Sequence, residues 1–275
     1  MCIRDRNGVL VWNKKENKLF NLFKIWRQIR KTNYDTVITL QRFFSSGWLT
    51  AFSGASKKIG FDKNPMSAFF TGRFKHLIST EKNSPHEVER NLELIKELTD
   101  DRFFKPKLYP SMQDFAAVRD ANSYVTISPT SVWFTKQWPA EKWIALIHKL
   151  PPTDRVYLLG APTDKKACQA IANASKHSNV IVKAGEFSLL QSAALMKGAK
   201  MNYVNDSAPL HLASAMNAPV TAVFLSTVPQ FGFTPLSDDS TILETSHELS
   251  CRPCGLHGKS ACPEGHFKCA EIENY

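Results

Sequence analysis

The chain has 275 residues, is 43% hydrophobic and 11% aromatic, and carries 35 Lys and Arg against 25 Asp and Glu, which gives a net charge of +10. This length and composition permit a large buried core and favour about two domains. No apolar run is long enough to span a membrane, and the N-terminus lacks a signal-peptide pattern, so we predict a cytoplasmic protein without disulfides. The positive charge indicates either an anionic partner, such as phosphates, nucleic acid or acidic lipid, or simply a solvated surface.

The N-terminal part predicts alternating strands and helices. Its opening residues, MCIRDR, show no apolar period, and we interpret them as a non-native end. The expected elements in chain order are a strand at 8–12, a helix from 19, a strand at 34–40, a weaker helix at 45–53, a strand at 57–61 and a helix from 84. Ser84 and Glu87 have the spacing of a capping box for the last helix, with Pro85 at its first position.

The C-terminal part alternates more regularly. A loop rich in proline and charge, residues 100–123, separates it from the N-terminal part, and we place two domains at 1–115 and 116–275. The expected strands lie at 124–128, 155–160, 179–182, 201–205 and 219–225, and the expected helices at 140–150, 164–177, 188–197 and 208–217. Apolar strands alternating with helices predict an α/β fold with a parallel sheet covered on both faces.

Ligands of such sheets bind beyond the carboxyl ends of the strands, where the strand order reverses. With the common order 3-2-1-4-5, this crevice lies between the first and fourth strands of the C-terminal part. The loops that leave these strands carry Thr130, Ser131 and Lys136, and Asp206 and Ser207. Two helix N-termini with hydroxyl groups and a lysine suit a phosphate or diphosphate.

The same residues have simpler explanations. Asp206, Ser207 and Pro209 are types that favour a helix start, so capping alone could account for them. Lys136 could be solvated, and His211, in the first turn, could be structural. Trp133, Trp138 and Trp143 are expected to pack rather than to stack on a ligand. Neither G-x-G-x-x-G nor G-x-x-x-x-G-K-[ST] occurs, which disfavours a dinucleotide dehydrogenase and a P-loop NTPase.

Four stretches together resemble glycosyltransferase family 9, the ADP-heptose:lipopolysaccharide heptosyltransferases. They are SPTSVWFTKQWPAEKW (128–143), NDSAPLHLASAMNAPVTAVF (205–224), FGFTPL (231–236) and CRPCGLHGKSACPEGHFKC (251–269). The N-terminal part fits more loosely, through YDTVITLQ, SGASKKIGFD and the helix after Ser84. The resemblance implies a GT-B fold of two Rossmann-like domains with parallel sheets, of which the C-terminal one binds the nucleotide-sugar donor and the N-terminal one is incomplete.

The resemblance also implies roles for individual residues. Thr130, Ser131 and Lys136 match the loop that contacts the donor diphosphate, and Lys136 would stabilise the departing ADP. Asp206, Ser207, Ala208 and His211 match residues around the phosphate and ribose, and Phe187 matches an apolar contact to the adenosine. Core packing is the alternative role of Phe187.

An inverting transfer needs a base for the acceptor hydroxyl. In the family this base is an aspartate in a Gly-Asp motif, which nothing between Met1 and Leu19 matches, and Asp5 lacks its context. We therefore expect an N-terminally truncated chain without the base, which would bind donor weakly and transfer no sugar. The expected acceptor is the Kdo-containing inner core of lipid A at the cytoplasmic face of the inner membrane. Arg42 is a candidate acceptor contact, and the basic N-terminal part suits this anionic surface.

The last 25 residues contain Cys251, Cys254, Cys262 and Cys269, with His257 and His266 nearby. These ligands would suffice for a structural zinc site, although the second pair lacks close C-x2-4-C spacing. Similar cysteines accompany family members whose chemistry needs no metal, so we expect no catalytic cofactor. A zinc-ribbon nucleic-acid module would leave the alternating strands and helices unexplained.

The sequence therefore predicts an inverting heptosyltransferase of lipopolysaccharide synthesis that uses ADP-heptose and needs no catalytic metal. Two alternatives stay open. One is another nucleotide-sugar glycosyltransferase of cell-surface glycan synthesis, and the other is a nucleotide-binding or membrane-surface module without catalysis.

Overall fold

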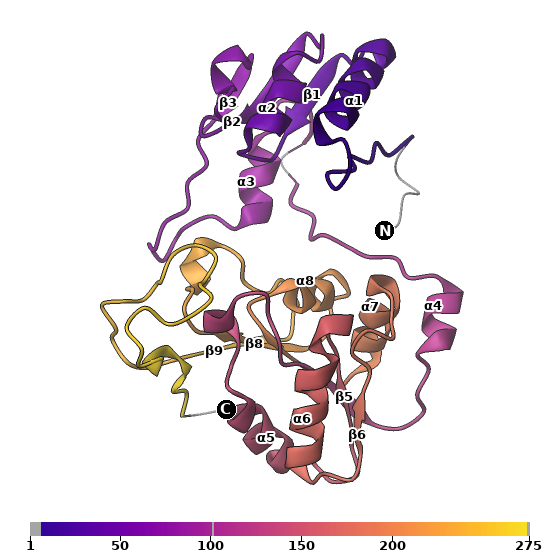
Figure 1. Cartoon of the computed structure of the whole chain (residues 1–275), viewed down its shortest axis with the longest axis vertical. Helices are drawn as coiled ribbons and strands as arrows, with labels where there is room; N and C mark the ends of the chain where they lie inside the picture. The colour runs from indigo at the N-terminus through magenta and orange to yellow at the C-terminus, as the bar shows by residue number, and fades with distance from the viewer. Residues whose placement is uncertain (1–6, 101, 274–275) are drawn as a thin grey trace. The chain divides into compact units, whose positions relative to one another are not determined.

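The computed structural model describes residues 7–100 and 102–273, and the chain divides between Phe104 and Lys105 into two compact units (Figure 1). We call residues 7–104 the N-terminal unit and residues 105–273 the C-terminal unit. The opening MCIRDR, with Cys2 and Asp5, lies outside the described residues. In the described part of the chain, no helix is both long enough and apolar enough to cross a membrane.

The N-terminal unit is built on a small parallel sheet with the strand order β1-β2-β3. Its elements are α1 (Lys18–Thr32), β1 (Thr36–Thr39), α2 (Phe44–Ala51), β2 (Lys57–Phe61), β3 (Gly72–Phe74) and α3 (Glu87–Glu93). The buried cluster is correspondingly small and consists of Ile59, Phe61 and Leu94, with a few half-buried neighbours. The helix predicted from residue 19, the weaker helix and the strands at 34–40 and 57–61 are confirmed, whereas the sequence did not predict β3.

Two local predictions in this unit are wrong. The stretch GVLVW forms no strand, because its apolar residues are largely exposed and join no ladder of the described sheets. The capping box starts at His86 instead of Ser84: His86 Nδ1 accepts from Val88 N, and the Glu89 carboxylate accepts from His86 N. This shift leaves the Glu87 carboxylate to pair with His76 and Arg90.

The C-terminal unit is built on a six-stranded, fully parallel sheet with the order β6-β5-β4-β7-β8-β9. The strands are β4 (Tyr124–Ser128), β5 (Arg155–Leu158), β6 (Val180–Val182), β7 (Asn202–Asn205), β8 (Val220–Phe224) and β9 (Ser240–Glu244). The helices are α4 (Met112–Ala117), α5 (Ala140–Lys149), α6 (Lys165–Ser175), α7 (Leu189–Gly198) and α8 (Ala208–Ala215). The sequence predicted all of these except α4 and β9, and it predicted the α/β class and the order 3-2-1-4-5 for the first five strands.

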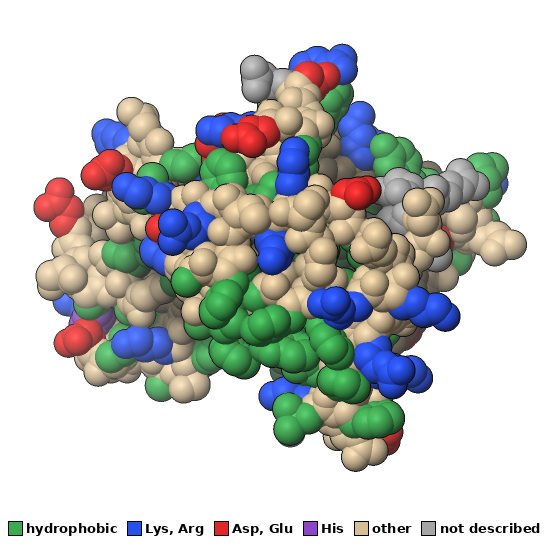
Figure 2. All heavy atoms as spheres, turned by 90° about the horizontal axis from the view of Figure 1, so that it is seen from above, with side chains coloured by type: hydrophobic (Ala, Val, Ile, Leu, Met, Phe, Trp, Pro, Cys, Tyr) green, Lys and Arg blue, Asp and Glu red, His purple; other side chains and the backbone are tan. Residues whose placement is uncertain are grey.

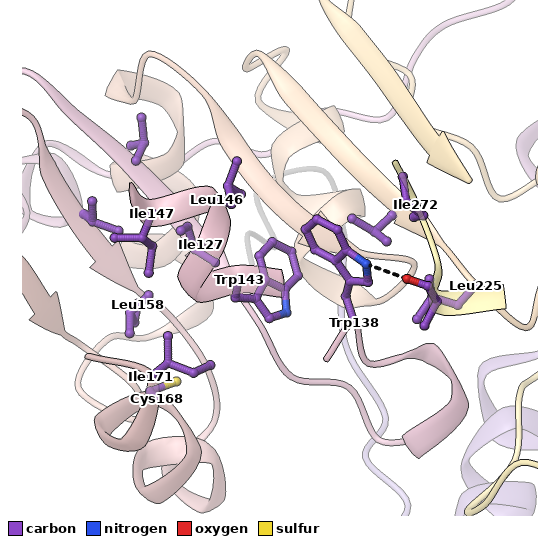
Figure 3. Close-up of a cluster of buried hydrophobic side chains, with 14 of the residues drawn as sticks. Ile127, Trp138, Trp143, Leu146, Ile147, Leu158, Cys168, Ile171, Leu225 and Ile272 are labelled. Atoms are coloured by element: carbon purple, nitrogen blue, oxygen red, sulfur yellow. Dashed lines mark hydrogen bonds between the residues drawn. The ribbon is translucent and has the colours of Figure 1, made fainter. Parts of the chain in front are cut away.

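Two apolar layers explain why these strands are buried on both faces. Alternate residues of each strand point to opposite sides. In β5, Val156 and Leu158 pack with α5, α6 and the end of the chain, whereas Tyr157 packs with α7 and α8. Figure 3 shows the first layer, in which Trp138 and Trp143 meet edge to face with ring centroids 5.0 Å apart. Their predicted packing role is confirmed, whereas Trp133 is exposed.

The strand order fixes where a ligand could bind. β4 and β7 are neighbours, and the chain leaves them in opposite directions along the sheet, to β5 and to β8. Loops that separate in this way expose the sheet's carboxyl edge between them. The loop after β4 and the short connection from β7 to α8 therefore meet at one edge.

Candidate functional site

The side chain of Asn205 joins the two loops at the carboxyl ends of β4 and β7. It is fully buried, its Nδ2 donates to Pro129 O at 2.9 Å, and its Oδ1 accepts from Trp138 N at 3.0 Å. Longer contacts of 3.4 Å and 3.5 Å reach the carbonyls of Ser128 and Thr130. One side chain thus fixes both ends of the loop that contains Lys136.

Lys136 and Asp206 form an ion pair at this edge. Lys136 Nζ lies 2.7 Å from Asp206 Oδ2, with side-chain exposures of 14% and 7%. The Thr227 hydroxyl, at the end of β8, donates to the same carboxylate oxygen at 2.6 Å. Because partial burial reduces screening by water, the pair and its hydroxyl donor hold Lys136 in place more firmly than a surface pair would.

The N-terminus of α8 is not closed by the side chains that were expected to cap it. Ser207 occupies the N-cap position but makes no side-chain cap hydrogen bond, and its hydroxyl instead donates to Asn205 O at 3.3 Å. The Asp206 carboxylate pairs with Lys136. The capping explanation of Asp206 and Ser207 is therefore wrong, because neither side chain forms the capping hydrogen bond at the start of this helix.

The other residues that were expected to contact the nucleotide-sugar donor also lie in the C-terminal unit. Thr130 and Ser131 are half-buried in the loop after β4, and Ala208 and His211 are exposed in the first turn of α8. Phe187 follows β6 and packs half-buried against the second apolar layer, with Lys183 Nζ 5.7 Å from its ring centre. These residues all come from loops or helix starts that follow the carboxyl ends of the strands.

Arg42 belongs to the N-terminal unit, where it is half-buried just after β1. A buried charge network follows β3 in the same unit: His76 Nε2 lies 3.2 Å from the Glu87 carboxylate, which also accepts from Arg90 Nε at 2.8 Å. Burial lowers the pKa of His76, and Arg42 and Arg90 act in the same direction, against the opposing effect of Glu87. Arg42 therefore lies within electrostatic range of this network.

The cysteine tail shows no metal site. Among residues 7–100 and 102–273, no three His, Cys, Asp or Glu side chains are arranged to hold a metal ion. Cys251 Sγ lies 3.8 Å from His266 Nε2, and Cys254 Sγ donates to Cys251 O. Burial raises the pKa of the Cys269 thiol to about 11 and also raises that of Cys254. The zinc hypothesis therefore gains no support from the described residues.

The arrangement suits a compound with a charged phosphate group. A lysine, two hydroxyl residues and a helix N-terminus lie around one sheet edge, and the adjacent carboxylate is already neutralised by Lys136. The sequence did not identify Asn205 and Thr227 as functional candidates. Asn205 stood in the expected stretch next to Asp206, but only its burial and its contacts with the loop after β4 indicate its role.

The chain is similar to known proteins over most of its length. The family model described as glycosyltransferase family 9 (heptosyltransferase) matches residues 22–263. Lipopolysaccharide heptosyltransferase 1 of Pseudomonas aeruginosa is 25% identical over 89% of this chain and 68% of its own length. Lipopolysaccharide heptosyltransferase 3 of Escherichia coli is 29% identical over 78% of this chain and 66% of its own length. The chain thus spans about two thirds of these curated relatives.

A solved structure has the same fold. The E. coli ADP-heptose lipopolysaccharide heptosyltransferase II matches with a TM-score of 0.70 at 21% sequence identity, over 86% of this chain and 78% of its own. The match includes both units, which agrees with two parallel sheets of the GT-B type.

Proposed function

The chain belongs to glycosyltransferase family 9, and from this premise we propose that it binds ADP-heptose for transfer of heptose to the lipopolysaccharide inner core. The relatives named above support the reaction class, and the name of the E. coli neighbour supports the donor. The observation that carries the proposal is the Lys136–Asp206 pair beside the start of α8, at the carboxyl edge of the sheet.

Lys136 would stabilise the leaving group. In an inverting transfer the acceptor oxygen bonds to the anomeric carbon, the bond from this carbon to the diphosphate breaks, and its electrons remain on ADP. An ammonium group has three N–H donors, so pairing with Asp206 leaves donors for the phosphate oxygens. Preorganised charge of this kind contributes strongly to catalysis because it needs no rearrangement during the reaction.

The other donor residues would bind and orient the nucleotide. Thr130 and Ser131 supply hydroxyl donors, and the first turn of α8, with Ser207 and Ala208, supplies backbone N–H groups. His211, exposed in that turn, would donate to the phosphate or ribose region, and Phe187 would contact the adenosine. No catalytic metal or other cofactor enters this scheme.

We assign the binding of the acceptor to the N-terminal unit. Arg42 would contact the anionic inner core, a Kdo-lipid A type acceptor. We assign the base that removes the proton of the acceptor hydroxyl to no residue of this sequence.

We further propose that the N-terminal unit lies against an anionic membrane surface, at the cytoplasmic face of the inner membrane, where such an acceptor would be held. Helix α1 has no buried residue and no acidic residue in its sequence KLFNLFKIWRQIRKT. Leu19, Phe20 and Phe23 of this helix are exposed, next to Lys24 and Arg27. Figure 2 shows hydrophobic side chains gathered on one face with lysines and arginines around them. Apolar and basic side chains on one helix suit an anionic lipid interface.

Donor selectivity and transfer test the proposal together. ADP-heptose and ADP should bind more tightly than UDP and GDP in calorimetric titrations, and ADP release should require both ADP-heptose and heptose-free lipopolysaccharide. Because no residue of this sequence is assigned as the base, transfer is assayed with the protein expressed from its complete reading frame, and binding of ADP without transfer by that protein would support a nucleotide-binding module. Tighter binding of UDP would support another nucleotide-sugar transferase, and binding of no nucleotide would contradict the proposal.

A further inference from the structure

The end of the chain packs on the loop that contains Lys136. We call residues 251–272 the tail and residues 133–138 the lysine loop. The tail contacts five of the six residues in this loop, in the pairs Phe134 with Phe267, Thr135 with Lys259, Trp133 and Lys136 with Gly258, and Trp138 with Ala270. The two segments are more than a hundred residues apart in the sequence, so this contact is a feature of the folded C-terminal unit.

Thr135 makes the most extensive of these contacts. Its backbone N–H donates to Lys259 O at 3.1 Å, and its hydroxyl accepts from Lys259 N at 2.8 Å and from the Ser226 hydroxyl at 2.9 Å. The same hydroxyl donates to Lys259 O at 3.3 Å. A buried threonine hydroxyl has one donor and two acceptor sites, and here all three are used. Thr135 therefore connects the lysine loop to the tail and to the end of β8.

Gly258 lies directly against the side chain of Lys136. A Cβ atom at this position would be 2.9 Å from Lys136 Cγ, 3.1 Å from Lys136 Cδ and 3.1 Å from Trp133 Cβ. Its φ of +80° is in the left-handed region that favours glycine. The tail thus brings bare backbone against the aliphatic stem of Lys136, and any larger residue there would displace that stem.

Two aromatic contacts fix the ends of the lysine loop. Phe134 stacks on Phe267 with ring centroids 5.3 Å apart. Trp138 Nε1 donates to Ala270 O at 3.2 Å, the hydrogen bond drawn in Figure 3. The loop itself contains only a short 3-10 turn, Phe134–Lys136, so these contacts supply the order that a longer helix would otherwise provide.

We propose that the tail is a positioning device for Lys136, with Gly258 and Thr135 as its principal residues. This inference rests on the proposed function for its consequence in donor binding. A lysine side chain loses conformational entropy when it is fixed. The contact with Gly258 restricts the stem before any ligand arrives, so that Nζ stays next to Asp206 at the sheet edge. The cysteine-rich segment therefore acts on Lys136 through its packing against the lysine loop.

The test compares Gly258→Ala with Gly265→Ala in the full chain. Gly265 also lies in the tail with a positive φ of +71°, but nothing lies within 4 Å of a Cβ built there. Both substitutions strain the backbone in the same way, and only the first meets Lys136. We expect the dissociation constant for ADP, measured by calorimetry, to rise about tenfold for Gly258→Ala and less than about twofold for Gly265→Ala. Equal affinities in the two variants would overturn the inference.

A second readout does not depend on nucleotide binding. Displacement of the Lys136 stem should change the rate at which Lys136 is acylated by an amine-reactive reagent, measured by peptide mass spectrometry without ligand. Gly258→Ala should change this rate severalfold, and Gly265→Ala should leave it unchanged. If the unmodified chain binds no ADP, the proposed function fails, and the acylation rates alone decide the positioning role.

Threonine variants cover the case in which Gly258→Ala does not fold. Thr135→Ser keeps the hydroxyl that accepts from Lys259 and Ser226, whereas Thr135→Val removes it at nearly equal volume. We expect Thr135→Val to weaken ADP binding and to alter the rate of Lys136 acylation. In Thr135→Ser, both the ADP affinity and the acylation rate should stay close to those of the unmodified chain. A loss of thermal stability without either change would make the role of Thr135 purely structural and would contradict the inference.

Discussion

The carboxyl edge of the C-terminal sheet and the exposed apolar surface of the N-terminal unit use polar and apolar side chains in opposite ways. In the C-terminal unit, buried polar groups gather at the carboxyl edge of the sheet, where Asn205, Asp206 and Thr227 are all hydrogen-bonded. In the N-terminal unit, large apolar side chains are exposed, among them Phe20, Phe43 and Phe44. Burying polar groups costs free energy unless partners are supplied, and exposing aromatic groups forgoes the gain of burial.

The contrast separates a binding site formed before its ligand arrives from a surface that gains stability when it is covered. The Lys136 edge is ordered by internal contacts, so substitutions there should change affinity through named hydrogen bonds. The apolar surface of α1 should respond to lipid and salt instead. The predictions below test this division.

The largest effect on stability is expected from the two asparagines of β7. Asn202 and Asn205 are both fully buried and each makes several hydrogen bonds, Asn202 at the amino end of the strand and Asn205 at the carboxyl end. Replacing either by Ala should lower the free energy of unfolding by about 2–3 kcal/mol, because buried partners lose their hydrogen bonds. Urea denaturation measures this cost.

Only Asn205→Ala should also weaken ADP binding, by about tenfold or more, since Asn205 fixes the lysine loop. Asn202→Ala is the matched control for burial and stability. An equal loss of affinity in both variants would mean that general destabilisation, and not the local geometry of the edge, sets nucleotide binding.

A smaller effect is expected for membrane association. Phe20→Ser and Phe23→Ser should each reduce binding to vesicles that contain anionic lipid by about tenfold, given about 1.5–3 kcal/mol for burial of a Phe side chain. Binding should also weaken with salt. Vesicle co-sedimentation measures both effects. Phe115→Ser and Leu189→Ser, at exposed apolar positions of the C-terminal unit, are the controls, and losses of equal size there would remove α1 as the contact.

The smallest predicted effect concerns pH. The folded-state pKa of His76 is lowered, chiefly by burial, so the unfolded chain binds a proton more readily. The stability contributed by neutral His76 is complete above its unfolded pKa of about 6.5 and is lost as the pH falls below that value, by up to about 1.4 kcal/mol per pH unit. Urea titrations at pH 7.5 and 5.5 should show this loss. It should be smaller in His76→Phe than in the unmodified chain, and an identical loss in the two proteins would contradict the assignment to His76.

The strands of the C-terminal unit could be predicted because apolar residues dominate segments such as YVTIS and VTAVF, as expected for strands covered on both faces. The weaker elements could not. β3 has three residues and α4 has six, too few to show a period, and β9, at the edge of the sheet, is exposed at three of its five positions. The capping box was placed two residues early because Glu87 is used by His76 and Arg90, which a local pattern cannot indicate.

The same limit applies to the candidate site. The sequence placed Lys136 and Asp206 at neighbouring loops because parallel strands end at one edge, and the structure shows the two side chains in contact. It could not indicate that Ser207 leaves α8 without a side-chain cap, since Ser is also the preferred cap residue. The sequence also could not indicate that Gly258 and Lys259 pack against the lysine loop, because tertiary contacts between distant segments leave no periodic pattern.

The central claim is that Lys136, held by Asp206 and Thr227, provides the positive charge for the donor diphosphate. Calorimetric titration of ADP into the unmodified chain and into Lys136→Ala tests it most directly, with urea denaturation of both proteins as the control for folding. We predict that Lys136→Ala weakens ADP binding by about a hundredfold or more, because a buried carboxylate then faces the diphosphate without its counter-charge. The free energy of unfolding of Lys136→Ala should also fall, because Asp206 loses its partner in the free protein, so the two affinities are compared under conditions in which urea denaturation shows both proteins to be folded. Unchanged ADP affinity in Lys136→Ala would contradict the account.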